Sequence, residues 1–133
     1  MKPTTAVCVA LALASSTLAA DVLAANPTQL LSAYSAQAGA APSVERGRGL
    51  FTATHGREWS CGSCHGEVPN GTGRHAATGK PIGALAPAAN PERFTDEARA
   101  EKWFRRNCND VLGRECSAAE KADVLAWLLT VKR

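Results

Sequence analysis

The chain has 133 residues, a length typical of one domain, and 45% of them are hydrophobic. Its formal net charge is a modest +3, spread along the chain. Because no basic stripe is present, the composition argues against a protein that binds nucleic acid.

Residues 1–25 have the pattern of a secretory signal peptide. A lysine near the start is followed by an apolar stretch rich in alanine and leucine over residues 6–20, and small residues come next. The apolar stretch is shorter than the ~20 residues that cross a bilayer, which disfavours a retained membrane anchor. We expect export to the periplasm and cleavage after Ala24 or Ala25, with residues 19–20 as the alternative site.

The domain that remains, residues 26–133, shows helix signals from its start. Its opening Asn-Pro pair predicts the beginning of a first helix, which ends at Gly39. Ser43 is the expected N-cap of a second helix, with the sequence VERGRGLFTATHG. Gly47 and Gly49 either weaken this second helix or let it pack closely against a partner.

Residues 66–93 are rich in Gly, Pro, Asn and Thr and predict a long loop. A structureless loop of this length is unusual in a compact domain unless it has a function, so we expect it to border the functional site. Thr95 is the expected N-cap of a helix over residues 96–107, which has acids in its first turn and arginines in its last. Ser117 and Glu120 form a capping box that opens the C-terminal helix. With strand signals nearly absent, the prediction is an all-α fold of four or five short helices.

The stretch WSCGSCHG places Cys61, Cys64 and His65 in a CxxCH motif, the spacing that attaches a c-type haem. Each thiol can add across a haem vinyl group, and the histidine then becomes an axial ligand of the iron. The alternatives are a redox dithiol, a structural disulfide, and a zinc site made by the four cysteines of the exported chain. A redox dithiol lacks its βαβ context, and the C-x7-C spacing of the second pair disfavours zinc. The motif therefore predicts covalently bound haem c.

The second axial ligand is open from the residues alone. The only methionine is Met1, which lies in the signal peptide, so the common His/Met ligation is excluded. His55 and His75 each lie ten residues from the CxxCH histidine, and either would give a bis-His electron carrier. The alternative for each is a histidine of an exposed loop that does not ligate iron. An unusual oxygen or nitrogen donor and an open site are the other possibilities.

The segment RNCNDVLGREC holds the remaining cysteines of the exported chain, Cys108 and Cys116. In an oxidising compartment these two residues favour a disulfide, which would close a short loop after the helix that ends at Asn107. Such a bridge would hold Asn107 rigidly, which suits a functional group placed over a haem. The alternative is an asparagine that ends the helix in the left-handed conformation that this residue tolerates.

Three segments, GKPIGALAP, ANPERFTDEARAEKWFRRNCNDVLGREC and SAAEKADVLAWL, resemble the SHP-type cytochromes c, a family of oxygen-binding monohaem proteins. The resemblance runs from about Pro27 to the C-terminus, and its most specific parts are CxxCH, the missing methionine, KWFRRNC and the second cysteine. In that family the second axial ligand is an asparagine immediately before the first cysteine of a disulfide. The resemblance therefore implies Asn107 as the ligand and Cys108–Cys116 as the bridge. Asn109 is the competing choice, and it matches the family pattern less well.

The resemblance also implies a class I cytochrome c-like fold around one haem, and a function. A neutral amide can hold Fe(III) but binds the softer Fe(II) poorly, so reduction would release Asn107 and open a site for O2, CO or NO. The freed amide could then donate a hydrogen bond to bound O2. A bis-His carrier through His55 or His75, without ligand binding, is the alternative function.

The expected partners also follow from the resemblance. Members of this family work with a dihaem cytochrome c and a membrane-bound cytochrome b, so both are implied redox partners, and we expect a monomer. The sequence shows no arrangement of catalytic acid, base or nucleophile. We therefore expect electron transfer and binding of small ligands, while reactivity towards O2 or NO is left open.

Overall fold

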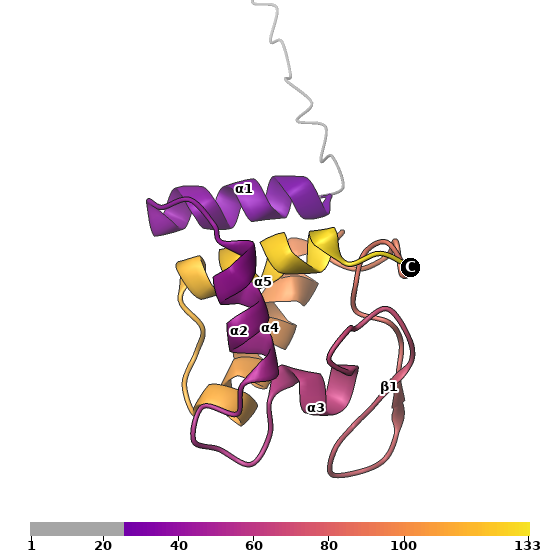
Figure 1. The fold of residues 1–133 in the computed structure, drawn as a ribbon. Helices are drawn as coiled ribbons and strands as arrows, with labels where there is room; N and C mark the ends of the chain where they lie inside the picture. Colours follow the sequence, from indigo (N-terminus) through magenta and orange to yellow (C-terminus); the bar gives the residue numbers. More distant parts are fainter. Residues whose placement is uncertain (1–25) are drawn as a thin grey trace, which may run out of the picture.

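The computed structural model describes residues 26–133 (Figure 1). The predicted signal peptide, residues 1–25, lies outside the described residues, so its cleavage and the export of the chain stay predictions. The described part contains five helices and two very short strands: α1 (Pro27–Ala38), α2 (Val44–Thr52), α3 (Cys61–His65), β1 (Gly73–Arg74), β2 (Pro81–Ile82), α4 (Glu97–Leu112) and α5 (Ala118–Thr130). None of these helices is long and apolar enough to cross a membrane. The predicted helical fold is confirmed.

The residues that begin the helices are mostly the predicted ones. Three predicted N-caps are confirmed: Asn26 for α1, Ser43 for α2 and Ser117 for α5. The prediction for α4 is wrong by one residue, because its N-cap is Asp96, whose carboxylate accepts a hydrogen bond from the Arg99 N–H at 2.9 Å. The hydroxyl of Thr95 instead donates to the carbonyl of Glu92 at 2.9 Å. Both Asp96 and Thr95 are residue types that cap helices, and the local backbone decides between them.

Helix α4 also runs further than predicted. It continues past Asn107 to Leu112 and ends on Gly113, whose φ of 73° is left-handed. No helix breaker precedes this glycine, and Val111 is buried against the core, which stabilises the additional turn. Asn107 and Cys108 therefore lie inside the helix, and the interpretation of Asn107 as the residue that ends it is wrong.

The long segment between α3 and α4 is an ordered loop with its own hydrogen bonds. Its strands β1 and β2 pair in antiparallel fashion, with Gly73 opposite Ile82. Further along, the carbonyl of Pro69 accepts hydrogen bonds from the N–H groups of Leu85 and Ala86, both at 3.0 Å. These bonds fold the segment back on itself, so the prediction of a loop is confirmed, although sequence patterning missed the two strands.

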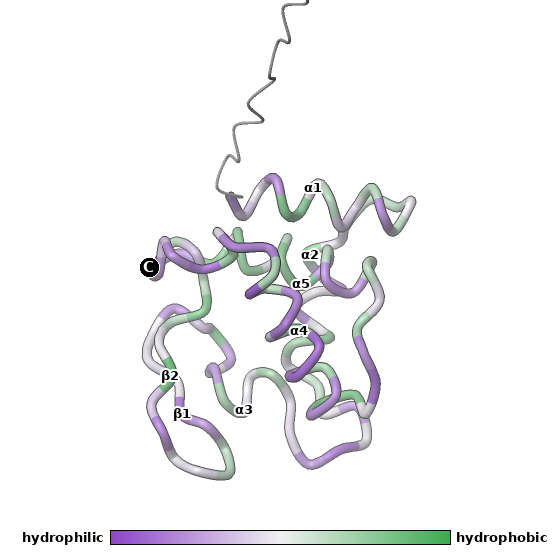
Figure 2. The backbone as a smooth tube through the Cα atoms, turned by 180° about the vertical axis from the view of Figure 1, so that it is seen from behind, coloured by the Kyte–Doolittle hydropathy of each residue, from purple (hydrophilic) through white to green (hydrophobic). Residues whose placement is uncertain are grey.

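Helix α5 is the centre of the core. Every residue from 122 to 128 is buried, while the outward side of α4 is mainly hydrophilic (Figure 2). The close crossing of α2 over α5 depends on Gly47, because a Cβ there would collide with the backbone of Asp123 and Val124. Gly49, by contrast, faces open space. Close packing through a glycine is therefore confirmed for Gly47 alone.

Asp123 strengthens the same crossing. Its buried carboxylate accepts hydrogen bonds from Nε and Nη2 of Arg46, at 2.7 and 2.8 Å, and from the backbone N–H of Ser43 at 2.6 Å. A buried carboxylate is tolerated only when it is paired in this way. The start of α2 is thus fixed to α5, and α2 leads directly into the segment that carries the CxxCH motif.

Candidate functional site

A cavity of about 760 Å³ is bordered by α2, α3, α4, α5 and the loop of residues 66–93. This volume falls within the ~300–1,000 Å³ that is usual for sites of small molecules and cofactors. The predicted position of the long loop beside the functional site is confirmed, since His75, Ile82 and Leu85 line the cavity. Much of the remaining wall is aromatic or aliphatic, including Leu50, Phe51, Phe94, Phe104, Val124 and Leu128.

Helix α3 brings all three residues of the CxxCH motif to this cavity. The helix is short, and it is held by a capping box in which the hydroxyl of Ser60 accepts a hydrogen bond from the Ser63 N–H at 3.1 Å. The cysteines of the motif line the cavity as free thiols, whereas Cys108 and Cys116 form a disulfide. Burial raises the pKa of the Cys61 thiol to about 11. Two thiols and an imidazole on one cavity wall are the donors that attachment of a c-type haem requires.

The loop supports α3 from outside. Gly73 of β1 lies so close to Cys64 that a Cβ would collide with the Cys64 carbonyl. The backbone N–H of Ala76 donates to Sγ of Cys64 at 3.2 Å. The loop therefore fixes the second thiol of the motif as well as the cavity wall.

His65 is mostly buried at the cavity wall, with its ring 6.2 Å from that of Phe51. Burial and the nearby positive charge of Arg93 lower the pKa of His65 to about 4. The imidazole is therefore neutral at pH 7 and keeps a nitrogen lone pair, which is the form that ligates iron.

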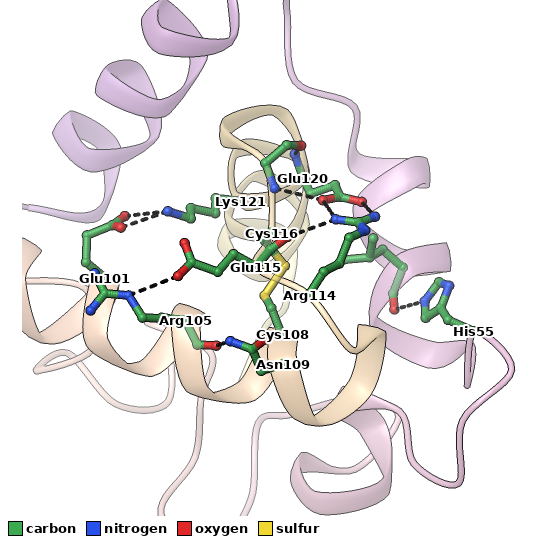
Figure 3. Close-up of a disulfide and its surroundings, with 12 residues drawn as sticks. His55, Glu101, Arg105, Cys108, Asn109, Arg114, Glu115, Cys116, Glu120 and Lys121 are labelled. Carbon is green, nitrogen blue, oxygen red and sulfur yellow. Dashed lines mark hydrogen bonds and ion pairs between the residues drawn. A yellow bond between two sulfur atoms is a disulfide. The ribbon is translucent and has the colours of Figure 1, made fainter.

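The structure separates the two asparagines that the sequence left in competition. Asn107 lines the cavity, and Asn109 does not. Two positions along an α-helix correspond to a rotation of roughly 200° about the helix axis. The two side chains therefore leave nearly opposite sides of the helix, and only one of them can face a given wall. The exposed Asn109 amide donates to the carbonyl of Arg105 at 2.8 Å, beside the disulfide (Figure 3). Asn107, opposite it on the helix, is the one that faces the cavity.

The two other histidines are placed differently from one another. His55 is exposed and does not line the cavity, and its Nε2 lies 2.8 Å from the carbonyl of Leu50 (Figure 3). His75 is half-buried at the cavity wall, and its Nδ1 accepts a hydrogen bond from the Thr78 N–H at 3.3 Å. With Nδ1 accepting, the proton of the neutral ring belongs to Nε2, which then has no lone pair for iron. This contact disfavours His75 as a ligand in the observed conformation.

The predicted disulfide Cys108–Cys116 is present, with its Cα atoms 5.6 Å apart (Figure 3). Cys108 lies in the last turns of α4, and Cys116 lies one residue before Ser117, the N-cap of α5. The bridge thus joins α4 to the start of α5 at the edge of the cavity. A zinc site made by four cysteines is wrong, because this pair is oxidised and residues 26–133 hold no cluster of three or more His, Cys, Asp or Glu suited to a metal.

Sequence reasoning missed Arg93, one of the charged residues of the site. Arg93 lines the cavity, and its guanidinium donates from Nε to the carbonyl of Ala84 and from Nη2 to that of Gly83, both at 2.9 Å. Nothing in the local pattern ANPERF distinguishes this arginine from one in an exposed loop, because its partners lie nine and ten residues away in the chain.

Comparisons with known proteins show which families and structures this chain is similar to. The chain matches DUF1924, a domain of unknown function, over residues 37–128. It is 52% identical over 120 residues to the cytochrome c-type protein SHP of Cereibacter sphaeroides, covering 86% of this chain and 92% of that protein. It is also 44% identical over 94 residues to cytochrome c'' of Methylophilus methylotrophus, covering 68% of this chain and 65% of that protein.

Solved structures of the same proteins share the fold. Oxidised SHP, described as an oxygen-binding cytochrome c, superimposes with a TM-score of 0.74 at 52% identity, covering 78% of this chain and 96% of its own. Oxidised cytochrome c'' from Methylophilus methylotrophus gives a TM-score of 0.71 at 38% identity, covering 81% and 96%. A solution structure of that cytochrome c'', presented with insights into haem-ligand detachment, gives 0.67 at 38% identity and covers 80% and 94%.

Proposed function

This chain belongs to the SHP family of c-type cytochromes, which carry covalently bound haem c, and from that premise we propose that it is an exported cytochrome with a redox-labile Asn107 ligand. In this proposal the protein accepts an electron and then binds O2 at the reduced iron, with NO and CO as further ligands. The single observation that carries the proposal is that Asn107 faces the cavity while Asn109 is turned away from it.

The residues present fit a haem c. Cys61 and Cys64 would form the two thioether bonds, and the neutral imidazole of His65 would ligate the iron. When bound, haem c would supply an iron that alternates between Fe(III) and Fe(II). Apolar wall residues such as Phe51 and Leu128 keep water away from the cavity, which favours binding of small neutral molecules.

Asn107 is suited to a ligand that leaves on reduction. Its amide oxygen is a neutral, hard donor, which suits Fe(III) better than Fe(II). None of the hydrogen bonds within residues 26–133 involves the Asn107 side chain, so no hydrogen-bond partner competes for the amide. After release, the amide still holds two N–H donors inside the cavity, where they can bond to a small polar ligand. The detachment of a haem ligand described for cytochrome c'' supports this proposal.

The proposed partners are proteins that deliver electrons, namely a dihaem cytochrome c and a membrane-bound cytochrome b, and the proposed protein is a monomer. Trp103 is 43% exposed at the cavity edge, and the guanidinium of Arg106 lies 5.6 Å from the centre of its ring. Aromatic residues and arginines are enriched at protein interfaces, so we propose this edge of the cavity as the contact surface for the electron donor.

The bis-His carrier is the second candidate, and His75 favours it because this residue also lines the cavity. Adding CO to the purified, dithionite-reduced holoprotein distinguishes the two functions. A released asparagine leaves an open position, so the reduced spectrum should shift promptly with CO. A reduced spectrum that stays low-spin and does not respond to CO would contradict the proposal and favour bis-His ligation.

A further inference from the structure

Arg93 is a cation at the cavity wall without an anionic partner. Its guanidinium spends two N–H donors on the carbonyls of Ala84 and Gly83. A guanidinium has five N–H groups, so three donors stay available. No carboxylate within residues 26–133 forms an ion pair with Arg93, although the side chain is partly buried.

The other two arginines of the cavity wall differ from Arg93. Arg99 pairs with Asp96 at 3.8 Å, and Arg106 lies over the ring of Trp103. A charge that is partly removed from water needs a counter-charge, and the burial of Arg93 lowers its pKa, as expected when that counter-charge is missing. An anion that enters this cavity would satisfy Arg93.

We propose that Arg93 binds a propionate carboxylate of the haem. This inference rests on the haem-binding role of the cavity. The propionates are the anionic groups of a haem, and the planar fork of a guanidinium matches a carboxylate with two parallel hydrogen bonds. The same side chain holds Gly83 and Ala84, so it connects the propionate to the loop that forms the cavity wall.

A purely structural role is the competing explanation, in which Arg93 only fixes the loop through its two carbonyl contacts. The two roles differ in what a change of charge does. A cation bound to the propionate repels the net positive charge of ferric haem and therefore favours Fe(II). Removal of this cation favours Fe(III). A loop contact has no such effect on the iron.

The experiment compares three holoprotein variants with the parent: Arg93→Gln, Arg93→Lys and, as the matched control, Arg133→Gln. Arg133 donates from Nε to the carbonyl of Ala88 in the same loop but does not line the cavity. The readouts are the midpoint potential and the resonance Raman band of propionate bending, which responds to hydrogen bonding at the carboxylate. Arg93→Gln should shift the band and lower the equilibrium constant for reduction about tenfold, which is ~59 mV for one electron. Arg133→Gln should change neither readout to a comparable extent.

Arg93→Lys keeps the charge but loses the fork, so the potential should stay near that of the parent while the propionate band shifts. If Arg93→Gln does not fold, the band of Arg93→Lys decides, and an unchanged band would overturn the proposal. Equal potentials and equal bands in Arg93→Gln and Arg133→Gln would also overturn it and leave Arg93 with the loop role alone. Failure of Asn107 ligation would be recognised separately, from the spin state of the parent protein.

Discussion

Asn107 and Cys108 are consecutive residues of α4, and the disulfide from Cys108 to Cys116 fixes the turn from which Asn107 faces the cavity. A covalent bond holds the neighbouring turn, so the backbone of Asn107 has little freedom left to lose in the proposed binding of iron. Ordering a flexible segment costs free energy. A ligand that is already held in place avoids part of this cost, which matters most for a weak neutral ligand.

Asn107→Val keeps the approximate size of the side chain and removes the donor. We expect the ferric protein to change from six-coordinate, low-spin to high-spin, and to bind azide readily. The O2 dissociation rate should rise by roughly fivefold, since a hydrogen bond contributes ~1 kcal/mol. Optical and EPR spectra of the ferric protein measure the first effect, and O2 dissociation by stopped flow measures the second.

Asn109→Val is the matched control, because Asn109 is exposed and bonds only to the carbonyl of Arg105. Its ferric spectrum should equal that of the parent. A low-spin ferric spectrum in Asn107→Val, together with its loss in Asn109→Val, would move the ligand by two residues.

The disulfide should be tested by the double change Cys108→Ser and Cys116→Ser. A bridge between residues eight positions apart contributes ~2–3 kcal/mol in the loop-entropy model, so the free energy of unfolding should fall by about that amount. Because the bridge also fixes the turn that holds Asn107, part of the ferric protein should become high-spin. Denaturant unfolding and the ferric spectrum measure the two effects. An unchanged spectrum would show that α4 alone holds Asn107 in position.

Short-range signals in the sequence predict much of this fold and part of the site. Caps such as Ser43 and Ser117 and the CxxCH spacing depend on atoms only three or four residues apart, so local sequence determines them. The end of α4 was misjudged because its additional turn is stabilised by burial of Val111, which is a tertiary effect.

The choice between Asn107 and Asn109 has a different origin. It depends on which side of α4 faces the cavity, and both residues lie in the same short polar segment. The family resemblance favoured Asn107, and in the packed helix Asn107 is the one of the two asparagines that lines the cavity. Arg93 was missed because its environment is created by the backbone of residues 83–84 and by a cavity, neither of which leaves a pattern in the sequence.

Gly47→Ala should destabilise the protein, because the added Cβ collides with the backbone of Asp123, which cannot yield as a side chain can. Overpacking of this kind costs ~1–3 kcal/mol. Gly49→Ala is the matched control on the same helix, where nothing lies within contact distance of the new Cβ. It should leave the free energy of unfolding unchanged or raise it by ~0.5–1 kcal/mol. Thermal and denaturant unfolding of the two variants measure the contrast, and equal losses would refute a special role for Gly47.

Stability in acid should depend on Glu120. Its carboxylate accepts hydrogen bonds from both Nη groups of Arg114, at 2.8 and 2.7 Å, and from the Ser117 N–H at 2.8 Å. The Arg114 contact and the Ser117 bond lower the pKa of Glu120 from 4.5 to about 2. A depressed folded-state pKa means that the stabilisation is complete above pH 4.5 and is lost as the pH falls towards 2.

Glu120→Gln removes this charge. The variant should be less stable than the parent at pH 7, and the difference should shrink steadily between pH 4.5 and pH 2. Denaturant unfolding at a series of pH values measures the difference. A gap that stays constant over this range would show that Glu120 acts through its capping geometry and not through its charge.

The histidines decide between the two proposed functions. His65→Ala removes the neutral imidazole at the cavity wall, so the iron environment should change in both the ferric and the ferrous protein. His55→Ala should leave both spectra nearly unchanged, since His55 lies outside the cavity with Nε2 against the carbonyl of Leu50.

His75→Ala is the critical variant, because His75 lines the cavity but accepts the Thr78 N–H at Nδ1. To ligate through Nε2 it would have to move its proton to Nδ1 and break that hydrogen bond, so we expect its ferric spectrum to stay low-spin. A high-spin ferric spectrum in His75→Ala, with Asn107→Val unaffected, would assign the second axial position to His75 and make the protein a bis-His electron carrier.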